Sequence, residues 1–377
     1  MAGIGARLDP GRTTSRRHAD GSDSRQGGRR PGIGIRHFLQ EIHMSKYPTL
    51  RNYGFGKQIA WAGHQALRDY YGHGHFASVQ AHFSRWQQFC GWLRDYYGIR
   101  DAGAIKPHHL DDYAEHIAQQ VEEDVMAVAY AQNLLSSVNV TLKALRGDGK
   151  LRIDSPAKWV GKRRHVRQEL PTGYEWEQFQ AAVDALYAAD MPRAVAVVEL
   201  ARSLGLRLRE AVLGDIPRWL RERDAHGKID VREGTKGGRG KEVARWVPVD
   251  GAADCALENA DSVRREQGCG NNLLKPHETY DGFVNDGEIH KARTILHRHG
   301  IKGYHELRAA WACDRYFELA GRCAPVVEQC SPSDEQSEEE SEAVATLSTE
   351  LGLELAQELG HNRLDVLAAY IGSHHRR

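Results

Sequence analysis

A long stripe of apolar residues restricts the fold of this chain more than any other local feature. Large apolar or aromatic side chains recur at spacings of three and four, at Phe76, Val79, Phe83, Trp86, Cys90, Leu93 and Tyr97. This spacing places them on one face of a helix, and Gly98 follows as a helix-ending residue. The stripe therefore predicts a helix over 76–97 that packs within a helical domain.

Two further helices are expected in the same region. One runs from Leu110 to about Gln120, after Pro107, and the other from about Val125 to Leu145, before the stop at 147–149. Residues 46–157 are therefore predicted to form an all-helical domain. Aromatic residues at helical spacing are more often core residues than platforms for stacked bases, and nothing in this domain looks catalytic.

The segments on either side of this domain differ from it in composition. Residues 1–45 are rich in Gly, Arg and Ser, which predicts a disordered basic segment, although Met44 is an alternative start. Pro156 marks a boundary, because the residue before a proline is pushed out of helix. A basic linker is predicted at 158–170. Its basic residues are Lys158, Lys162, Arg163, Arg164 and Arg167. They form either a solvated linker or a strap along DNA phosphates, where each contact releases counterions.

The remainder, 171–377, is predicted to be an α+β domain. Thr172 and Glu175 have the spacing of a capping box, which predicts the start of a helix. Residues 229–231 and 243–249 indicate two strands joined by the glycine-rich loop 233–240. Residues 322–345 run into an acidic serine tract, which predicts a disordered surface insertion. The chain as a whole is thus predicted to be mainly α with a small β-sheet.

Composition limits the class of protein. The length of 377 residues predicts about two or three domains, and 41% hydrophobic residues suffice for globular cores. No apolar run approaches the roughly 18–20 residues that cross a bilayer, and the N-terminus lacks a secretory signal. A cytoplasmic location is therefore expected. A net charge of zero argues weakly against nucleic acid, but the basic and acidic residues are segregated along the chain.

Cysteine and histidine spacings do not favour a metal site. The six cysteines are scattered and form no C-x-x-C pair, so reduced thiols are expected rather than a zinc site or disulfides. His290, His297 and His299 lack carboxylate or cysteine partners at a metal-binding spacing. No metal site is predicted.

Four short motifs in the second domain carry groups that suit chemistry on a phosphate. They are Gly205-Leu206-Arg207 with Glu210, Thr235-Lys236-Gly237, His305-Glu306-Leu307-Arg308, and Leu359-Gly360-His361 followed by Tyr370. Each motif alone has a common structural interpretation: a surface arginine, a lysine on a hairpin tip, a structural His-Arg pair and a half-buried tyrosine. Their combination in one domain is the informative feature.

Spacing makes a shared site geometrically reasonable. His305 and Arg308 are three residues apart, so they share a helix face. His361 and Tyr370 would lie on opposite sides of one continuous helix, so a turn is expected at Gly360 and Asn362 with a new helix near 363. A nucleotide-binding P-loop does not fit the glycine-rich loop, since its first glycine is missing and Lys241 is not followed by Ser or Thr.

These motifs, in this order, resemble the tyrosine recombinase (phage integrase) family. The resemblance covers about 170–377 well, and the helical segment before it is similar in kind to the family's core-binding, SAM-like DNA-binding domain. It implies a site-specific recombinase or integrase that serves a mobile element or phage. The implied partners are double-stranded DNA attachment sites, a homotetramer of this chain and accessory DNA-bending proteins, in a bacterial cytoplasm near the nucleoid.

The resemblance also implies a role for each residue. Tyr370 attacks a DNA phosphate, Arg207 and Arg308 hold its non-bridging oxygens, and His361 adds a donor. His305 assists proton removal from Tyr370 or hydrogen-bonds the phosphate, and Lys236 protonates the departing 5′-hydroxyl. The product is a 3′-phosphotyrosyl bond that a hydroxyl can reseal, so neither ATP nor a metal or other cofactor is needed.

Two departures and three alternatives accompany this hypothesis. The interval from Arg308 to His361 is long for the family, and the insertion at 322–345 accounts for the excess. Seven residues follow Tyr370, where many members carry a longer helix that docks on a neighbour, so the mode of assembly stays open. The alternatives are a type IB topoisomerase, a DNA-binding protein without catalysis, and a nucleotide-dependent enzyme.

Overall fold

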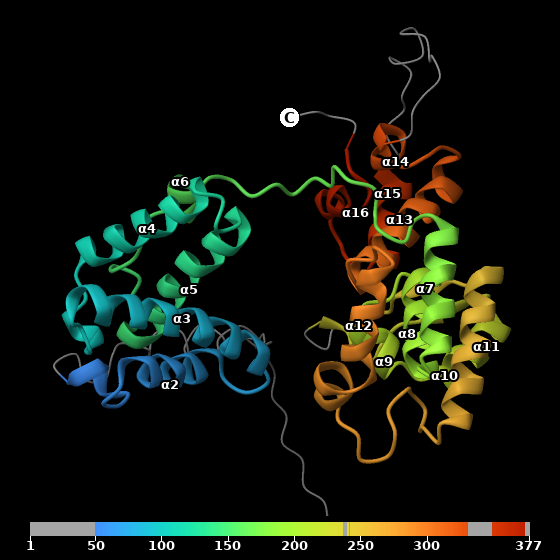
Figure 1. The fold of residues 1–377 in the computed structure, drawn as a ribbon, viewed down its shortest axis with the longest axis horizontal. Coiled ribbons are helices and arrows are strands. Elements are labelled where there is room, and N and C mark those ends of the chain that lie inside the picture. The colour runs from blue at the N-terminus through green and yellow to red at the C-terminus, as the bar shows by residue number, and fades with distance from the viewer. Residues whose placement is uncertain (1–49, 237–239, 241, 331–348, 374–377) are drawn as a thin grey trace, which may run out of the picture. The chain divides into compact units, whose positions relative to one another are not determined.

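The computed structural model describes residues 50–236, 240, 242–330 and 349–373. These residues divide into two compact units, and the division falls between Arg163 and Arg164 (Figure 1). That point lies inside the segment 158–170 predicted as a linker. The predicted disordered segment 1–45, including Met44, and the acidic tract 331–345 lie outside the described residues.

The first unit is helical in its described part. Its elements are η1 (Arg51–Gly54), α2 (Ile59–Tyr71), α3 (Phe76–Tyr97), η2 (Ala102–Ala104), α4 (Pro107–Glu122), α5 (Val128–Arg146) and α6 (Pro156–Val160). Helix α3 has the bounds that its stripe predicts, and it buries Trp86, Cys90 and Leu93. The ends of the stripe are exposed instead, since Phe76 is 77% and Tyr97 is 40% accessible.

The second unit is a mainly helical body with one small sheet. Its elements are α7 (Trp176–Ala188), α8 (Pro192–Ser203), α9 (Leu208–Leu213), α10 (Ile216–His226), β1 (Lys228–Asp230), β2 (Trp246–Pro248), α11 (Gly251–Glu266), η4 (Gly282–Asp286), α12 (Glu288–Arg298), α13 (Tyr304–Ala320), α14 (Pro325–Cys330), α15 (Thr349–Glu358), η6 (Leu364–Val366) and α16 (Ala368–Ile371). The two strands are antiparallel, with Ile229 opposite Val247. The predicted fold class, mainly α with a small β-sheet, is confirmed.

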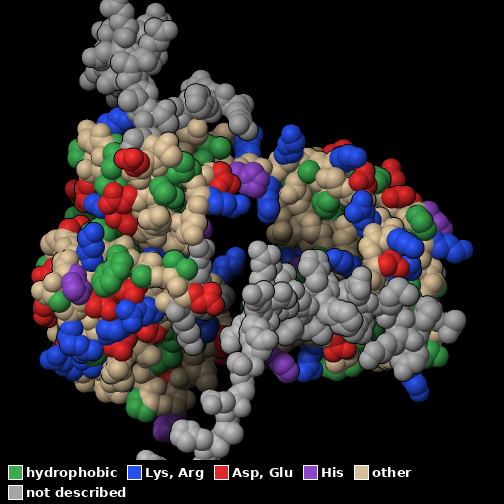
Figure 2. All heavy atoms as spheres, turned by 180° about the vertical axis from the view of Figure 1, so that it is seen from behind, with side chains coloured by type: hydrophobic (Ala, Val, Ile, Leu, Met, Phe, Trp, Pro, Cys, Tyr) green, Lys and Arg blue, Asp and Glu red, His purple; other side chains and the backbone are tan. Residues whose placement is uncertain are grey.

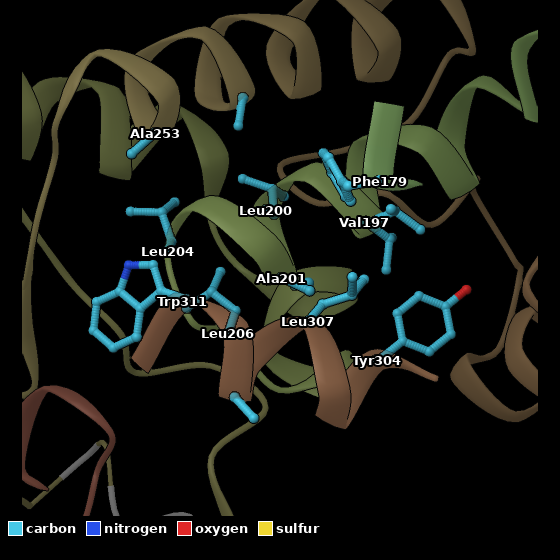
Figure 3. Packing of buried hydrophobic residues seen from close by; sticks show 14 of the residues in the cluster. Phe179, Val197, Leu200, Ala201, Leu204, Leu206, Ala253, Tyr304, Leu307 and Trp311 are labelled. Carbon is cyan, nitrogen blue, oxygen red and sulfur yellow. The ribbon is translucent and has the colours of Figure 1, made fainter. Parts of the chain in front are cut away.

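Helix α8 is the centre of the second unit, and α7, α11 and α13 pack around it. Figure 3 shows Leu200 and Ala201 of α8, and Leu204 directly after it, facing Leu307 and Trp311 of α13, with Leu206 between them. Leu206 precedes Arg207 directly, and Leu307 precedes Arg308. Two arginines of the predicted motifs are therefore anchored by leucines that are fully buried in the core.

Gly205 occupies a position that only glycine fits. Its φ is +59°, and a Cβ atom there would lie 2.3 Å from the ring of Trp311. A side chain would meet both the left-handed backbone penalty and a clash with a large buried ring. This glycine lets the chain turn from α8 toward Arg207 against the core.

The capping box predicted at Thr172 and Glu175 is wrong. Helix α7 begins at Trp176 with Glu175 as its N-cap, and no side chain caps it. The Thr172 hydroxyl accepts a hydrogen bond from the backbone N–H of Lys302 instead, at 3.0 Å. Residue 172 is thus used in a tertiary contact that local spacing cannot reveal.

The insertion predicted at 322–345 is too long at its N-terminal end. Residues 325–330 form α14, and Pro325, Val326 and Val327 are buried. Proline pre-organises the first turn of a helix, and the two valines after it provide an apolar face. Helix α14 packs against α16, which carries Tyr370. The start of the predicted insertion is therefore part of the fold around the tyrosine.

The visible surface carries both signs of charge. Figure 2 shows basic and acidic side chains interspersed over the face in view. Among the described residues, no helix is both long and apolar enough to span a membrane. No cluster of three or more His, Cys, Asp or Glu side chains suited to a metal ion occurs within those residues.

Candidate active site

Glu210 lies at the centre of the candidate site. It is fully buried in α9, and its carboxylate accepts bonds from the backbone N–H of Arg207 at 2.8 Å and from Arg207 Nη1 at 2.7 Å. Burial opposes ionisation, but the charges of Arg245, Arg308 and Arg207 outweigh it and lower the pKa of Glu210 to about 2. The carboxylate is therefore an anchor for several arginines. The sequence predicted this orienting role for Arg207 alone.

Arg245 is a member of this cluster that sequence reasoning missed. It is buried, and its Nη1 lies 2.7 Å from Glu210 Oε2 while its Nε donates to the carbonyl of Glu358 at 2.6 Å. Its Nη2 donates to the carbonyl of Gly205 at 3.4 Å. The sequence signal for a buried Arg245 was the alternation of side chains along an extended strand. Arg245 is two residues before Val247, so an extended chain points both side chains to the buried face.

Arg308 is completely buried and bonds to the same segments. Its Nη1 donates to the carbonyl of Gly205 and its Nη2 to the carbonyl of Leu359. Burial, together with the charges of Arg245 and Arg207, lowers the pKa of Arg308 to about 9, so the group is still charged at neutral pH. Its Nε has no hydrogen-bond partner among the described residues. The guanidinium of Arg308 therefore joins two backbone segments of the candidate site by hydrogen bonds to their carbonyls.

The end of α15 receives donors from three arginines. Arg207 Nη2 also donates to the carbonyl of Leu359, at 3.1 Å, beside the bond from Arg308. The last carbonyls of a helix carry partial negative charge, which suits cations there. Gly360 follows with φ +66°, and a Cβ there would lie 3.2 Å from Arg245 Cδ. The predicted turn at Gly360 is present, and it brings the next residue into the site.

His361 and Tyr370 are brought together by this turn. The Nε2 atom of His361 lies 3.2 Å from the Tyr370 hydroxyl and 3.3 Å from Arg207 Nη2. A guanidinium can only donate, so Nε2 accepts and the tautomer is assigned with its proton on Nδ1. Burial and the charges of Arg207, Arg308 and Arg245 lower the pKa of His361 to about 4. The ring is thus neutral at pH 7.

Tyr370 is more buried than the sequence suggests. It is 5% exposed, and the guanidinium carbon of Arg308 lies 5.4 Å from the centre of its ring. The short helix α16 carries it, after the turn η6, as expected for a new helix beyond residue 363. Leu367 and Ile371 belong to the same buried cluster as Tyr370, while Leu364 is 40% exposed.

His305 borders the tyrosine without a hydrogen bond to its hydroxyl. The two ring centres are 5.2 Å apart, and the imidazole is exposed at the start of α13. Desolvation of the imidazole by the protein around it lowers the pKa of His305, and the positive charge of Arg308 lowers it further. The structure therefore brings both histidines next to Tyr370, and of the two only His361 is hydrogen-bonded to the Tyr370 hydroxyl.

Lys236 stands at the edge of a pocket of about 730 Å³ in the second unit. Arg207, Arg245 and His361 line the same pocket, whereas Arg308 and Tyr370 do not. Lys236 is exposed, and the loop residues 237–239 and 241 lie outside the described part of the chain. The pocket is lined by five basic side chains, two carboxylates and the neutral His361, so basic groups outnumber acidic ones, which suits an anionic group such as a phosphate. The basic residues are Arg207, Lys228, Lys236, Arg245 and Arg363, and the acidic ones are Glu354 and Glu358.

The predicted DNA-contacting residues do not share one environment. Lys162, Arg163 and Arg164 are exposed. Lys158 on α6 forms an exposed ion pair with Asp154. Arg167 is different, because its guanidinium is paired with Glu306 and largely covered. The sequence shows that this segment is basic, but it does not show which of its side chains are engaged in ion pairs within the folded protein.

Comparison with known proteins finds a family that is similar to part of the second unit. A family model described as integrase matches residues 163–314. This part of the chain is therefore similar to the integrase family. The match confirms the resemblance to the tyrosine recombinases (phage integrases) drawn from the sequence. It spans Arg207, Lys236, His305 and Arg308, and it ends before His361 and Tyr370.

Two solved structures are also similar to this chain. One is described as XerA recombinase, with 15% identity over 83% of this chain and 94% of the other and a TM-score of 0.35. The other is a lambda integrase tetramer bound to a Holliday junction, with 14% identity over 82% of this chain and 75% of the other and a TM-score of 0.48. No curated protein sequence matches this chain.

Proposed function

We propose that the protein is a site-specific DNA recombinase that cuts and rejoins DNA through a 3′-phosphotyrosyl intermediate on Tyr370. The observation that carries the proposal is the bond of the Tyr370 hydroxyl to a neutral His361 beside three clustered arginines. A phenol attacks phosphate poorly unless a base removes its proton. The integrase family match supports DNA recombination as the general activity.

His361 takes the role of general base in this proposal. Its Nε2 already accepts from Tyr370, so the phenolic proton can pass to it as the tyrosine oxygen attacks phosphorus. This differs from the role implied by the resemblance, in which His361 is a phosphate donor and His305 assists the proton transfer. His305, exposed beside the ring, is then free to donate to a phosphate oxygen.

The arginines supply charge for the phosphate. Arg207 and Arg245 line the pocket, and Arg207 is partly exposed, so Arg207 is the foremost ligand for the non-bridging oxygens. Three guanidinium groups share one carboxylate, Glu210, so the cluster keeps an excess of positive charge. These positive charges are already in place to stabilise the negative charge that develops on the phosphate oxygens in the transition state.

Lys236 completes the cleavage step. The bond from phosphorus to Tyr370 forms, the bond to the 5′-oxygen breaks, and Lys236 gives that oxygen a proton. In rejoining, a 5′-hydroxyl gives its proton to Lys236 and attacks the phosphorus, the bond from phosphorus to Tyr370 breaks, and Tyr370 recovers its proton from His361. The substrates in this proposal are double-stranded attachment sites of a mobile element or phage, exchanged by a homotetramer, with accessory DNA-bending proteins as candidate partners.

A suicide DNA substrate tests the proposal. The protein is incubated with a nicked duplex carrying the presumed site, and the products are separated on a denaturing gel. We expect a covalent adduct from the wild type and none from Tyr370→Phe. Tight binding without an adduct from either protein would favour a binding protein without catalysis. Relaxation of supercoiled DNA lacking any attachment site would favour the type IB topoisomerase alternative.

A further inference from the structure

Arg167 differs from the other basic residues of its segment in how much protein surrounds it. Its Nη1 and Nη2 donate to Oε2 and Oε1 of Glu306, at 3.0 and 2.7 Å. The two side chains are only 12% and 18% exposed. Arg164, three residues earlier, is exposed and donates to Gln168. A bidentate, covered ion pair leaves Arg167 little capacity for a DNA phosphate.

The same residue is bonded to the segment that carries Tyr370. The backbone N–H of Arg167 donates to the carbonyl of Ala368 at 2.8 Å, and its Nε donates to that of Ala369 at 3.4 Å. Beyond the tyrosine, a Cβ on Gly372 would lie 3.2 Å from the carbonyl oxygen of Arg167. Arg167 is therefore hydrogen-bonded to the two residues before Tyr370, and its carbonyl lies near Gly372 on the other side.

Glu306 extends this connection to α13. It lies between His305 and Leu307 in the first turn of that helix, and it also accepts from the backbone N–H of Thr172 at 3.1 Å. Burial opposes its ionisation, but its bonds to Arg167 and Thr172 outweigh burial and lower the pKa of Glu306. The ion pair thus joins the tyrosine segment to the helix that carries His305 and Arg308.

Helix α16 needs such outside contacts. It has four residues, and a helix of one turn is unstable alone because nucleation is costly. Its position is set by the groups that hold it. A phosphoryl transfer depends strongly on in-line placement, so a small shift of Tyr370 would have a large effect on rate.

We propose that Arg167 is a positioning residue for Tyr370, acting through Glu306 and the carbonyls of α16, rather than a ligand of DNA phosphate. The inference rests on the proposed function, in which Tyr370 is the nucleophile. Arg163 and Arg164 keep the role of exposed cations in the same segment.

Paired variants distinguish the two roles. Arg167→Ala and Arg164→Ala remove the same charge three residues apart. We expect Arg167→Ala to slow adduct formation at saturating DNA by roughly 10- to 100-fold, with DNA affinity within about twofold of the wild type, whereas Arg164→Ala should lose affinity and keep its rate at saturating DNA. A larger loss of affinity in Arg167→Ala, with an unchanged rate at saturating DNA, would overturn the proposal.

A charge exchange separates positioning from a loss of folding. The double variant Arg167→Glu/Glu306→Arg restores the pair with its signs reversed, and we expect it to recover part of the rate lost in Arg167→Glu alone. A phosphate ligand would not be recovered, because Glu at 167 repels DNA. No recovery in a double variant whose melting temperature equals that of the wild type would contradict the positioning role.

Amide hydrogen exchange gives a readout that needs no DNA. In the full chain, peptides within 364–373 should exchange faster in Arg167→Ala than in Arg164→Ala. This result is expected even if the wild type forms no adduct, in which case the proposed function fails while the positioning of the segment stands. Equal exchange in the two variants would overturn the positioning role independently.

Discussion

The Nε2 atom of His361 lies 3.2 Å from the hydroxyl oxygen of Tyr370, although the two residues are nine positions apart. On a continuous helix they would point in opposite directions. The chain instead ends α15 at Glu358, turns at Gly360 and starts again with η6 and α16. This turn makes His361 the group best placed to accept the tyrosine proton, and the first prediction follows from it.

Replacement of His361 by Gln should reduce the rate of adduct formation by roughly 100-fold, the lower range for loss of a positioned general base. Glutamine can still accept a bond from Arg207 but cannot hold the proton of Tyr370. Single-turnover cleavage of the suicide substrate measures the effect. His305→Gln is the matched comparison. A full rate in His361→Gln together with a large loss in His305→Gln would show that His305 is the general base.

The lowered pKa of His361 predicts a stability change in acid. The folded group titrates at about 4, while an unfolded histidine titrates at about 6.5, so between these values the unfolded state binds more protons. Stability should therefore rise with pH through this window and be lost as the pH falls from 6.5 toward 4, by roughly 1–3 kcal/mol from this site. Urea unfolding at pH 7 and pH 4.5 measures it. The wild type should lose more than His361→Gln, and equal losses would contradict the shift.

Lys236 should matter most when the leaving group needs a proton. Lys236→Ala should lower cleavage of an ordinary phosphodiester by roughly 100-fold. Sulfur in place of the 5′-bridging oxygen should restore most of that rate, because a thiolate leaves without protonation near neutral pH whereas an alkoxide does not. Cleavage rates on the two substrates give the ratio. A similar deficit on both substrates would argue that Lys236 binds phosphate rather than donating a proton.

Arg245 should be needed for both the fold and the reaction. Arg245→Met removes a partner of the buried Glu210 and leaves that carboxylate with less compensation, which should cost about 3–5 kcal/mol. Glu210 also pairs with Arg207 and Arg308, so the double variant Arg245→Met/Glu210→Gln leaves those two guanidinium groups without their carboxylate and should recover neither stability nor adduct formation. Chemical denaturation and the cleavage assay report the two effects. Recovery of cleavage in the double variant would mean that Arg245 serves stability alone.

Gly205 should not tolerate a methyl group. Gly205→Ala combines a positive φ with a contact at 2.3 Å to Trp311, and overpacking of this kind costs about 1–3 kcal/mol beyond the backbone strain. Gly227→Ala is the control, since Gly227 has φ +63° but nothing within 4 Å of the added carbon. The difference in unfolding free energy between the two variants isolates the clash. Equal values would show that Trp311 moves aside without cost.

Much of the fold could be read from the chain because it depends on local chemistry. The apolar period of three and four fixed α3, and the glycine-rich stretch between apolar segments indicated the hairpin. The motifs around Arg207, Arg308 and His361 were also visible, since their residue types and order are local. Predictions failed where a residue in a local pattern takes part in a tertiary contact. The Thr172 hydroxyl, for example, accepts a hydrogen bond from the backbone of Lys302 instead of capping α7.

The sequence by itself determined which groups the four motifs supply, namely His305, His361, Lys236 and Tyr370 together with arginines of the same domain. Only the tertiary structure decided what each arginine does. Arg207 faces the pocket, Arg308 and Arg245 are buried against carbonyls and Glu210, and Arg167 is paired with Glu306 beside Tyr370. The physical reason is that an arginine's role depends on which distant carboxylate or carbonyl the fold brings within reach, and spacing along the chain carries no record of that.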